Sequence, residues 1–200
     1  MRTTRRGTER CGLIRRAATD LFLERGYDGV SVDDIIARAG GSKTNVYSHF
    51  GGKDGLFVAV VETLCDEINA KLKARDLTGL SLEQGLRVLG SALLAELLQD
   101  WHLALYRLVI AESARFPEIG RAWGAHGPET SCRILTEFIA SRQPAEAPVE
   151  PHRAATLFHD MILFEALHRA VCGLPTPVTQ REIDHLIDEA LAVFTRGYAR

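Results

Sequence analysis

The 200-residue chain is predicted to be an all-α protein of about nine to ten helices. Three observations predict this class. Apolar residues recur at the i, i+3, i+4 and i+7 spacing of a helix along nearly the whole chain. Helix-capping residues, glycines and prolines separate these segments. No segment shows the alternation of apolar and polar residues that marks a half-buried strand.

The N-terminal region begins with a helix whose apolar face runs from Ile14 to Phe22 and which ends at Gly26. A second, short helix follows. Ser31 is a good N-cap for it, and Asp34 stands three residues on, as in a weak form of the capping box. We expect this second helix to end at Ala39, before a pair of glycines.

The third helix is predicted over 43–50, with Ser42 as its N-cap and a second glycine pair at its end. Two short helices joined by a tight glycine turn, after a longer amphipathic helix, are the sequence form of a helix-turn-helix. The further expected elements are about 53–73, 82–98, 101–115, a short element between Pro117 and Pro128, 129–141, 152–172 and 179–198.

The formal net charge of −2 hides an asymmetry. Residues 1–55 hold ten basic and seven acidic side chains, and residues 56–200 hold fourteen basic and nineteen acidic ones. A basic head on an acidic body indicates different partners for the two parts. We therefore expect a helix-turn-helix DNA-binding domain over 1–55 and a helical regulatory and dimerisation domain over 56–200.

Several classes of protein lack support in the sequence. No apolar stretch reaches ~18 residues and no signal-peptide core follows the N-terminal arginines, so we expect a cytoplasmic protein without a membrane partner. The four cysteines form no CxxC pair and are expected to be reduced thiols, with no metal ligand among them. There is no G-x-S-x-G, P-loop or G-x-G-x-x-G motif, so neither an enzyme nor a cofactor is expected.

The third helix is the expected reading helix, since the second helix of such a motif enters the major groove of DNA. Its polar side chains suit bases or phosphates. Helix N-termini and a basic arm would add phosphate contacts. The same polar face in an all-helical enzyme would only be solvated. The predicted DNA contacts are Arg5, Arg6, Ser31, Ser42, Lys43, Thr44, Asn45, Tyr47, Ser48, His49 and Lys53.

The order of residues 32–56 resembles the DNA-binding domain of the TetR family of bacterial transcriptional regulators. The resemblance rests on an apolar-Asp-Ile helix, then Ala-Gly-x-Ser-Lys, then Val-Tyr-x-His-Phe, then Lys-Asp-x-Leu, and covers about residues 9–56. Gly41 departs from it, because the family usually has an apolar residue there. The resemblance implies a homodimer that binds a palindromic operator, usually as a repressor until a small-molecule effector binds the body.

The body is similar to the AefR-like subgroup of this family in residues 107–118 and 127–129. The resemblance implies a dimer interface on the last two helices, formed by Leu157, Phe164, Leu167, Val171, Ile183, Leu186, Ile187, Ala190, Leu191 and Phe194. A ligand pocket between the middle helices and the eighth would use aromatic groups with a few polar tips. Its candidate lining residues are Trp101, His102, Tyr106, Trp123, Phe138, Phe158 and Met161.

Two alternatives to a ligand-responsive repressor stay open. Glu165-x-x-His168 and Glu182-x-x-His185 fall on consecutive helices, as in di-metal carboxylate bundle enzymes, which also need a glutamate from each of two other helices. The other alternative is a DNA-binding protein that responds to no ligand. His159 and Asp160 are expected to point different ways on a helix and so to form no catalytic pair.

Overall fold

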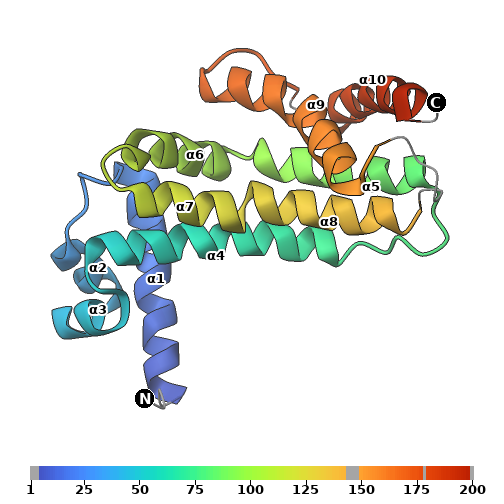
Figure 1. Ribbon diagram of the computed structural model, residues 1–200. Coiled ribbons are helices and arrows are strands. Elements are labelled where there is room, and N and C mark those ends of the chain that lie inside the picture. The colour runs from blue at the N-terminus through green and yellow to red at the C-terminus, as the bar shows by residue number, and fades with distance from the viewer. Residues whose placement is uncertain (1–4, 143–148, 178, 199–200) are drawn as a thin grey trace. The chain divides into compact units, whose positions relative to one another are not determined.

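The computed structural model describes residues 5–142, 149–177 and 179–198, and over these residues the chain forms ten helices and no strand (Figure 1). This confirms the all-α prediction. The helices are α1 (Arg5–Arg25), α2 (Val32–Ala39), α3 (Lys43–Phe50), α4 (Lys53–Lys73), α5 (Leu82–Leu97), α6 (Asp100–Ser113), α7 (Pro117–His126), α8 (Pro128–Ala140), α9 (Pro151–Val171) and α10 (Gln180–Tyr198).

Several helix starts differ from the expectation. Helix α1 begins at Arg5, well before the apolar face that starts at Ile14, because no proline interrupts the residues in between. Arg5 and Arg6 therefore belong to a helix, and their side chains lie outside the described part of the structure. Pro117 and Pro128 are the first residues of α7 and α8, where the missing N–H has no intrahelical partner to lose.

The capping box predicted at Ser31 is present, and a second one stands at Ser81. The Ser31 hydroxyl accepts a hydrogen bond from the Asp34 N–H at 3.1 Å, and the Asp34 carboxylate accepts one from the Ser31 N–H at 2.8 Å. Ser81 and Gln84 exchange the equivalent bonds at the start of α5. These reciprocal bonds satisfy backbone donors that the first helical turn leaves without a partner.

The chain divides by packing into two compact units, with boundaries within α4, within α6 and between α7 and α8. The first unit runs to Cys65 and includes Ala104–His126. Its core holds Ile14, Phe22 and Phe57, none of them exposed, and the Phe22 and Phe57 rings meet edge to face at 4.9 Å. The division into a DNA-binding domain at 1–55 and a body at 56–200 stays a prediction, because it concerns function rather than packing.

The second unit consists of Asp66–Leu103 and the residues from Gly127 onward. Helices α5, α8, α9 and α10 pack on one another around a single apolar cluster. Two glycines of α5 permit close approach. A Cβ on Gly85 would lie 1.9 Å from Phe138 Cζ, and one on Gly90 would lie 3.2 Å from Phe158 Cζ. Glycine at these positions lets α8 and α9 come close to α5.

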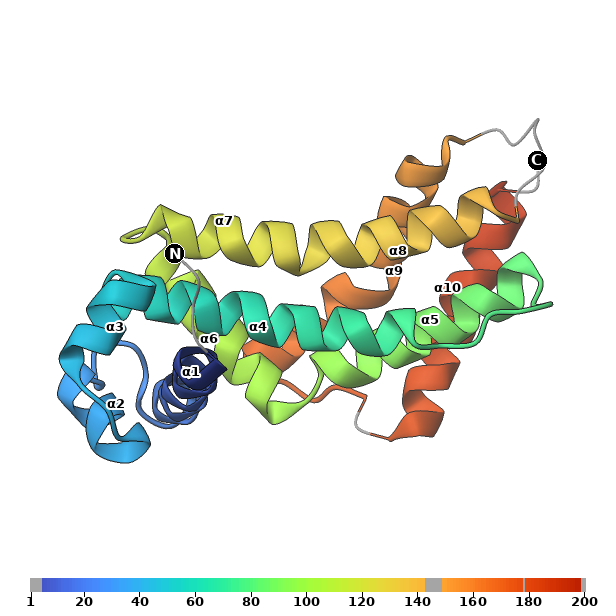
Figure 2. The ribbon, with the colours of Figure 1, turned by 90° about the horizontal axis from the view of Figure 1, so that it is seen from below.

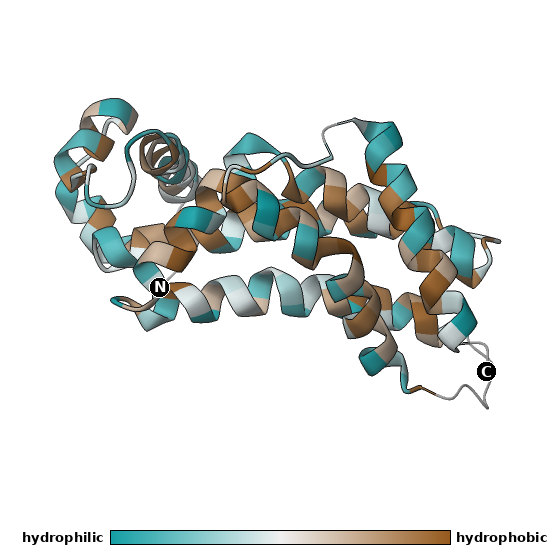
Figure 3. Ribbon diagram, turned by 90° about the horizontal axis from the view of Figure 1, so that it is seen from above, coloured by the Kyte–Doolittle hydropathy of each residue, from teal (hydrophilic) through white to brown (hydrophobic). Residues whose placement is uncertain are grey.

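The helices of the described chain carry both polar and apolar residues, as the mixed teal and brown ribbon of Figure 3 shows. Among the described residues, no helix is both long and apolar enough to cross a bilayer. A membrane-spanning helix needs about 20 predominantly apolar residues.

Candidate nucleic-acid interface

Helices α1, α2 and α3 form the predicted helix-turn-helix, and each contacts the other two (Figure 2). Val46 and Ile35 are fully buried and hold α3 and α2 in the core of the first unit. The polar side chains of α3 lie on its other faces. Asn45 is half-buried, and the exposed residues of α3 are Lys43, Thr44, Tyr47, Ser48 and His49. The apolar residues of α3 therefore anchor it, while its polar residues face solvent.

The two serines before these helices behave differently. Ser31 uses its side chain in the capping box of α2. Ser42 stands at the N-cap position of α3, but its side chain makes no cap hydrogen bond. The Asn45 N–H donates to the Ser42 carbonyl oxygen instead, at 3.0 Å. The expectation that the Ser42 hydroxyl caps α3 is therefore wrong, and that hydroxyl stays exposed at the start of the helix.

Lys43, at the start of α3, is paired within the protein. Its Nζ lies 2.9 Å from Oδ1 of Asp33 on α2, and both side chains are more than half exposed. The hydrogen bond to this carboxylate raises the pKa of Lys43. An exposed pair of this kind contributes little to stability, so the ammonium group can exchange Asp33 for a phosphate.

Lys53, at the start of α4, lies over an aromatic ring. Its Nζ is 4.1 Å from the ring centroid of Tyr27, and the Tyr27 hydroxyl donates to the Asp54 carboxylate. Burial, and then the Asp54 carboxylate, raise the pKa of Tyr27. The Tyr27 ring also meets Phe116 at 5.2 Å. Sequence reasoning missed this cluster, because its members are far apart in the chain.

Side chains of α1 support α2. The guanidinium of Arg38 donates two hydrogen bonds to the Glu24 carboxylate, each of 3.1 Å. Arg10 Nη1 donates to the carbonyl oxygen of Ala39, the last residue of α2, at 3.2 Å. The two contacts join α1 to the last turn of α2, directly before the turn that leads to α3.

Two family models match the chain. The model described as bacterial regulatory proteins, tetR family, matches residues 14–60. The model described as AefR-like transcriptional repressor, C-terminal domain, matches residues 84–200, which is more than half of the chain. The chain belongs to the TetR family. Members of this family are helix-turn-helix transcriptional regulators that bind DNA, which agrees with the exposed polar face of α3.

Curated relatives described as HTH-type transcriptional regulators match only part of the chain. The transcriptional activator FasR of Mycolicibacterium smegmatis is 40% identical over 60 residues, which are 30% of this chain and 27% of FasR. A transcriptional repressor of Mycobacterium tuberculosis is 40% identical over 84 residues, which are 40% of this chain and 45% of the repressor. The chain thus spans less than half the length of either relative.

Solved TetR-family structures match nearly the whole chain. A regulator from Mesorhizobium loti, described as a TetR-family transcriptional regulator, is 29% identical with a TM-score of 0.78 and 98% of both chains covered. The flavonoid-responsive regulator FrrA is 29% identical with a TM-score of 0.79, and the match covers 95% of this chain and 97% of FrrA.

The residues predicted for the dimer interface divide into two sets. Leu157 and Phe164 are exposed on α9, and Leu167, Val171 and Leu186 are half-buried. The other predicted residues are buried within the second unit, because α10 packs its main apolar face on α5 and α9 of the same chain. A partner cannot reach those side chains without a change in the fold. The buried set is Ile183, Ile187, Ala190, Leu191 and Phe194.

The predicted pocket residues also occupy different surroundings. In the first unit, Tyr106 and Trp123 are half-buried, and their rings stack at 5.1 Å. In the second unit Phe138 and Phe158 are buried in the apolar cluster, whereas Met161 is 40% exposed on α9. Met161 therefore does not line the interior of its unit. Trp101 is half-buried, and His102 is buried with its Nδ1 2.8 Å from the Leu97 carbonyl oxygen.

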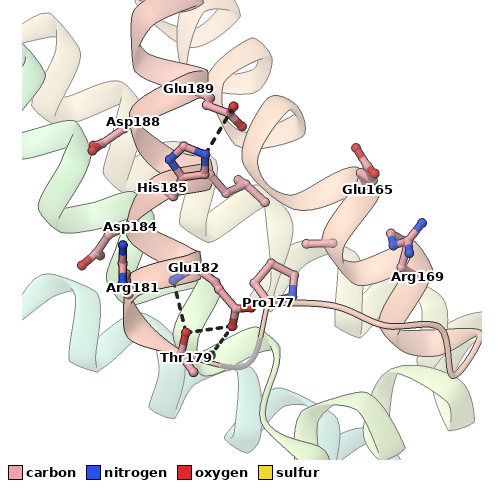
Figure 4. A pocket seen from close by; sticks show the side chains of 12 residues that line it. Glu165, Arg169, Pro177, Thr179, Arg181, Glu182, Asp184, His185, Asp188 and Glu189 are labelled. Carbon is pink, nitrogen blue, oxygen red and sulfur yellow. Dashed lines mark hydrogen bonds and ion pairs between the residues drawn. The ribbon is translucent and has the colours of Figure 1, made fainter.

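The residues of the di-metal hypothesis lie at the surface, and three of them, Glu165, Glu182 and His185, line a groove between α9 and α10 (Figure 4). Glu182 accepts from the Thr179 N–H and hydroxyl and so caps α10. His185 pairs with Glu189 at 3.6 Å. His168 stacks on Phe164. In the described ranges, no three His, Cys, Asp or Glu side chains gather as metal ligands, so the structure gives the di-metal hypothesis no support.

His159 and Asp160 were expected to point different ways, but the structure places their side chains in contact. The His159 Nδ1 lies 3.3 Å from the Asp160 carboxylate, and its Nε2 lies 3.2 Å from the Ser131 hydroxyl on α8. Burial lowers the pKa of His159, and Asp160 opposes that effect. Ser131 is only 4% exposed, so a substrate has no access to its hydroxyl. The contact joins α8 to α9 and provides no accessible nucleophile.

Proposed function

We propose that this TetR-family protein is a homodimeric repressor that reads a palindromic operator with α3 and leaves it when a small-molecule effector binds. The exposed polar face of α3, on a helix anchored by buried Val46, carries the proposal. The lysine, threonine, asparagine and serine on this helix match the hydrogen-bonding edges of bases in the major groove. The excess of basic residues in 1–55 favours phosphate contact.

Selection from a pool of randomised duplex DNA tests the reading function. We expect the protein to enrich a palindromic sequence. Lys43→Ala should lower affinity for the enriched duplex about tenfold or more, the order expected for one lost contact to a base or phosphate. Lys73→Ala is the matched control, since Lys73 is an exposed lysine at the far end of α4. No enriched sequence, or equal affinities for the two variants, would refute this proposal.

The dimer is proposed to form over the exposed apolar residues of α9 and α10. Phe164 is 73% exposed, and Leu157, Met161 and Val193 are between 39% and 64% exposed. Exposed apolar side chains that gather on one surface mark interaction sites. The groove beside them carries both Arg169 and Arg181 and several carboxylates, so two identical surfaces can pair opposite charges. A two-fold dimer also matches the symmetry of a palindrome.

Sedimentation velocity tests the dimer. The wild-type protein should sediment as a dimer and Phe164→Glu as a monomer, because a buried charge without a partner disfavours the interface. Ile110→Glu is the control, since Ile110 is an exposed apolar residue of α6 in the first unit. A dimer of undiminished affinity in Phe164→Glu would show that the interface lies elsewhere.

Two of the comparisons support the proposal that the protein represses transcription and leaves its operator when an effector binds. The matched C-terminal family is described as one of transcriptional repressors, and FrrA is described as flavonoid-responsive. We therefore propose that planar aromatic small molecules are the first effectors to test. A reporter gene behind the selected operator should be silenced by the protein and reactivated by an effector. Operator affinity that no compound lowers would favour the ligand-independent alternative.

A further inference from the structure

The turn between α2 and α3 is built from two glycines in backbone conformations that other residues rarely adopt. Gly40 has φ of 72° and Gly41 has φ of 108°. Only glycine adopts such angles at little cost. Gly41 stands where the family usually has an apolar side chain. The turn is therefore bare in this protein, which means that no side chain of its own packs at this position.

Arg10, on α1, occupies the space beside this bare turn. A Cβ on Gly40 would lie 3.3 Å from Arg10 Nη1, and one on Gly41 would lie 3.5 Å from Arg10 Cδ. The same Nη1 donates to the Ala39 carbonyl oxygen at 3.2 Å. The carbonyls of the last helical turn lack intrahelical donors and carry the negative end of the helix dipole. The Arg10 guanidinium satisfies one of them and supports the turn.

Asn45, a predicted base-reading residue, contacts the same bare turn. A Cβ on Gly41 would lie 3.4 Å from its Nδ2, and its N–H donates to the Ser42 carbonyl oxygen. A Cβ at position 41 would therefore contact both Arg10 and Asn45 at about van der Waals distance. Arg10 and Asn45 therefore both lie beside the bare position of the turn.

We propose that Arg10 is a positioning residue for DNA reading, which fixes the α2–α3 turn and through it the placement of Asn45. The inference rests on the proposed function of α3. A competing role for an arginine here is a direct phosphate contact. The two roles differ in outcome, because a phosphate contact strengthens binding to every sequence and steepens its salt dependence, whereas positioning affects only the reading of the operator.

The test compares Arg10→Met with Arg16→Met, a matched loss of charge at an exposed residue of the same helix. Affinities for the selected operator and for an unrelated duplex are measured over a range of salt, at a temperature where circular dichroism shows folded protein. We expect Arg10→Met to lower operator affinity about tenfold, as for loss of a charged hydrogen bond. Its affinity for the unrelated duplex and its salt dependence should match those of Arg16→Met.

The proposal would be overturned if Arg10→Met lost equal affinity for both duplexes and if its log affinity fell less steeply with log salt concentration than that of Arg16→Met, by about one in slope. That result would assign Arg10 to a phosphate contact. Undiminished operator affinity in Arg10→Met would also overturn the proposal. Gly41→Ala offers an independent variant, since alanine at φ of 108° is strained and its Cβ would contact both Asn45 and Arg10. It should show the same selective loss of operator affinity, and unchanged affinity would contradict the role of the bare turn.

Hydrogen exchange without DNA separates this proposal from the proposed function. In Arg10→Met the amides of Gly40 and Asn45, which donate to Ile36 and Ser42, should exchange at least about fivefold faster than in Arg16→Met, because the turn opens locally. Unchanged exchange would overturn the positioning role. If the wild-type protein selected no DNA, the proposed function would fail, and the exchange rates alone would decide whether Arg10 holds the turn.

Discussion

Acidification should destabilise the protein through His102. This side chain on α6 is 2% exposed, and its Nδ1 lies 2.8 Å from the Leu97 carbonyl oxygen. A carbonyl only accepts hydrogen bonds, so Nδ1 carries the proton of the neutral ring. Burial lowers the pKa of His102 from 6.5 to about 4, and the bond to Leu97 opposes part of that effect.

The sign and size of the change in the free energy of unfolding follow from proton linkage. Above pH 6.5 the ring is neutral in both the folded and the unfolded chain, and its contribution is fully present. As the pH falls from 6.5 to about 4, the unfolded chain binds a proton that the folded protein does not. Each pH unit in this window removes about 1.4 kcal/mol, so the free energy of unfolding falls by about 3 kcal/mol.

Urea denaturation at several pH values between 7 and 4 measures this loss. His102→Gln keeps a donor for the Leu97 carbonyl and does not titrate. The wild-type protein should therefore lose about 3 kcal/mol more than His102→Gln over this range. His49→Gln is the control, because His49 is exposed on α3, and it should follow the wild type. Parallel pH profiles of wild type and His102→Gln would refute the reasoning.

Three further substitutions test the packing and the caps, each through the free energy of unfolding in urea. Gly85→Ala should cost about 1–3 kcal/mol, because its Cβ would overlap the Phe138 ring, whereas Gly12→Ala, where a Cβ meets nothing within 4 Å, should not destabilise. An unchanged free energy of unfolding in Gly85→Ala would contradict this reasoning, because it would mean that α8 can move away from α5 without cost. Phe158→Ala should cost about 3–5 kcal/mol, since the ring is fully buried; a loss below about 1 kcal/mol would contradict its place in the core. Ser31→Ala should cost about 1 kcal/mol through loss of the α2 cap, and Ser42→Ala, which removes no cap bond, should be close to neutral.

Local features of the fold could be predicted from the chain alone. The capping boxes at Ser31 and Ser81 depend on residues three positions apart, so their geometry follows once the helix forms. The family-specific order of residues 32–56 was equally informative. The start of α1 could not be predicted in this way, because the residues before Ile14 show little apolar periodicity and yet continue the helix.

The partner of each apolar helix face could not be predicted from spacing. Helix α10 has a wide apolar face, and the same pattern suits packing on a second chain or on the protein's own α5. The structure buries Ile187 and Leu191 inside the second unit and leaves Phe164 and Val193 exposed. The expected dimer interface stays a prediction, because periodicity identifies an apolar face but not the surface that it meets.

The order of residues determined the class of this protein, its helix-turn-helix and the polar side chains of α3, since all of these depend on contacts within a few residues. Tertiary structure decided which basic side chains around the helix-turn-helix already have a partner within the protein. Lys43 pairs with Asp33, Lys53 lies over Tyr27, and Arg10 supports the glycine turn. The groups in the last two contacts lie more than 25 residues apart in the chain, and only the packing of α1 against its neighbours and of α4 against the Tyr27 turn brings them together.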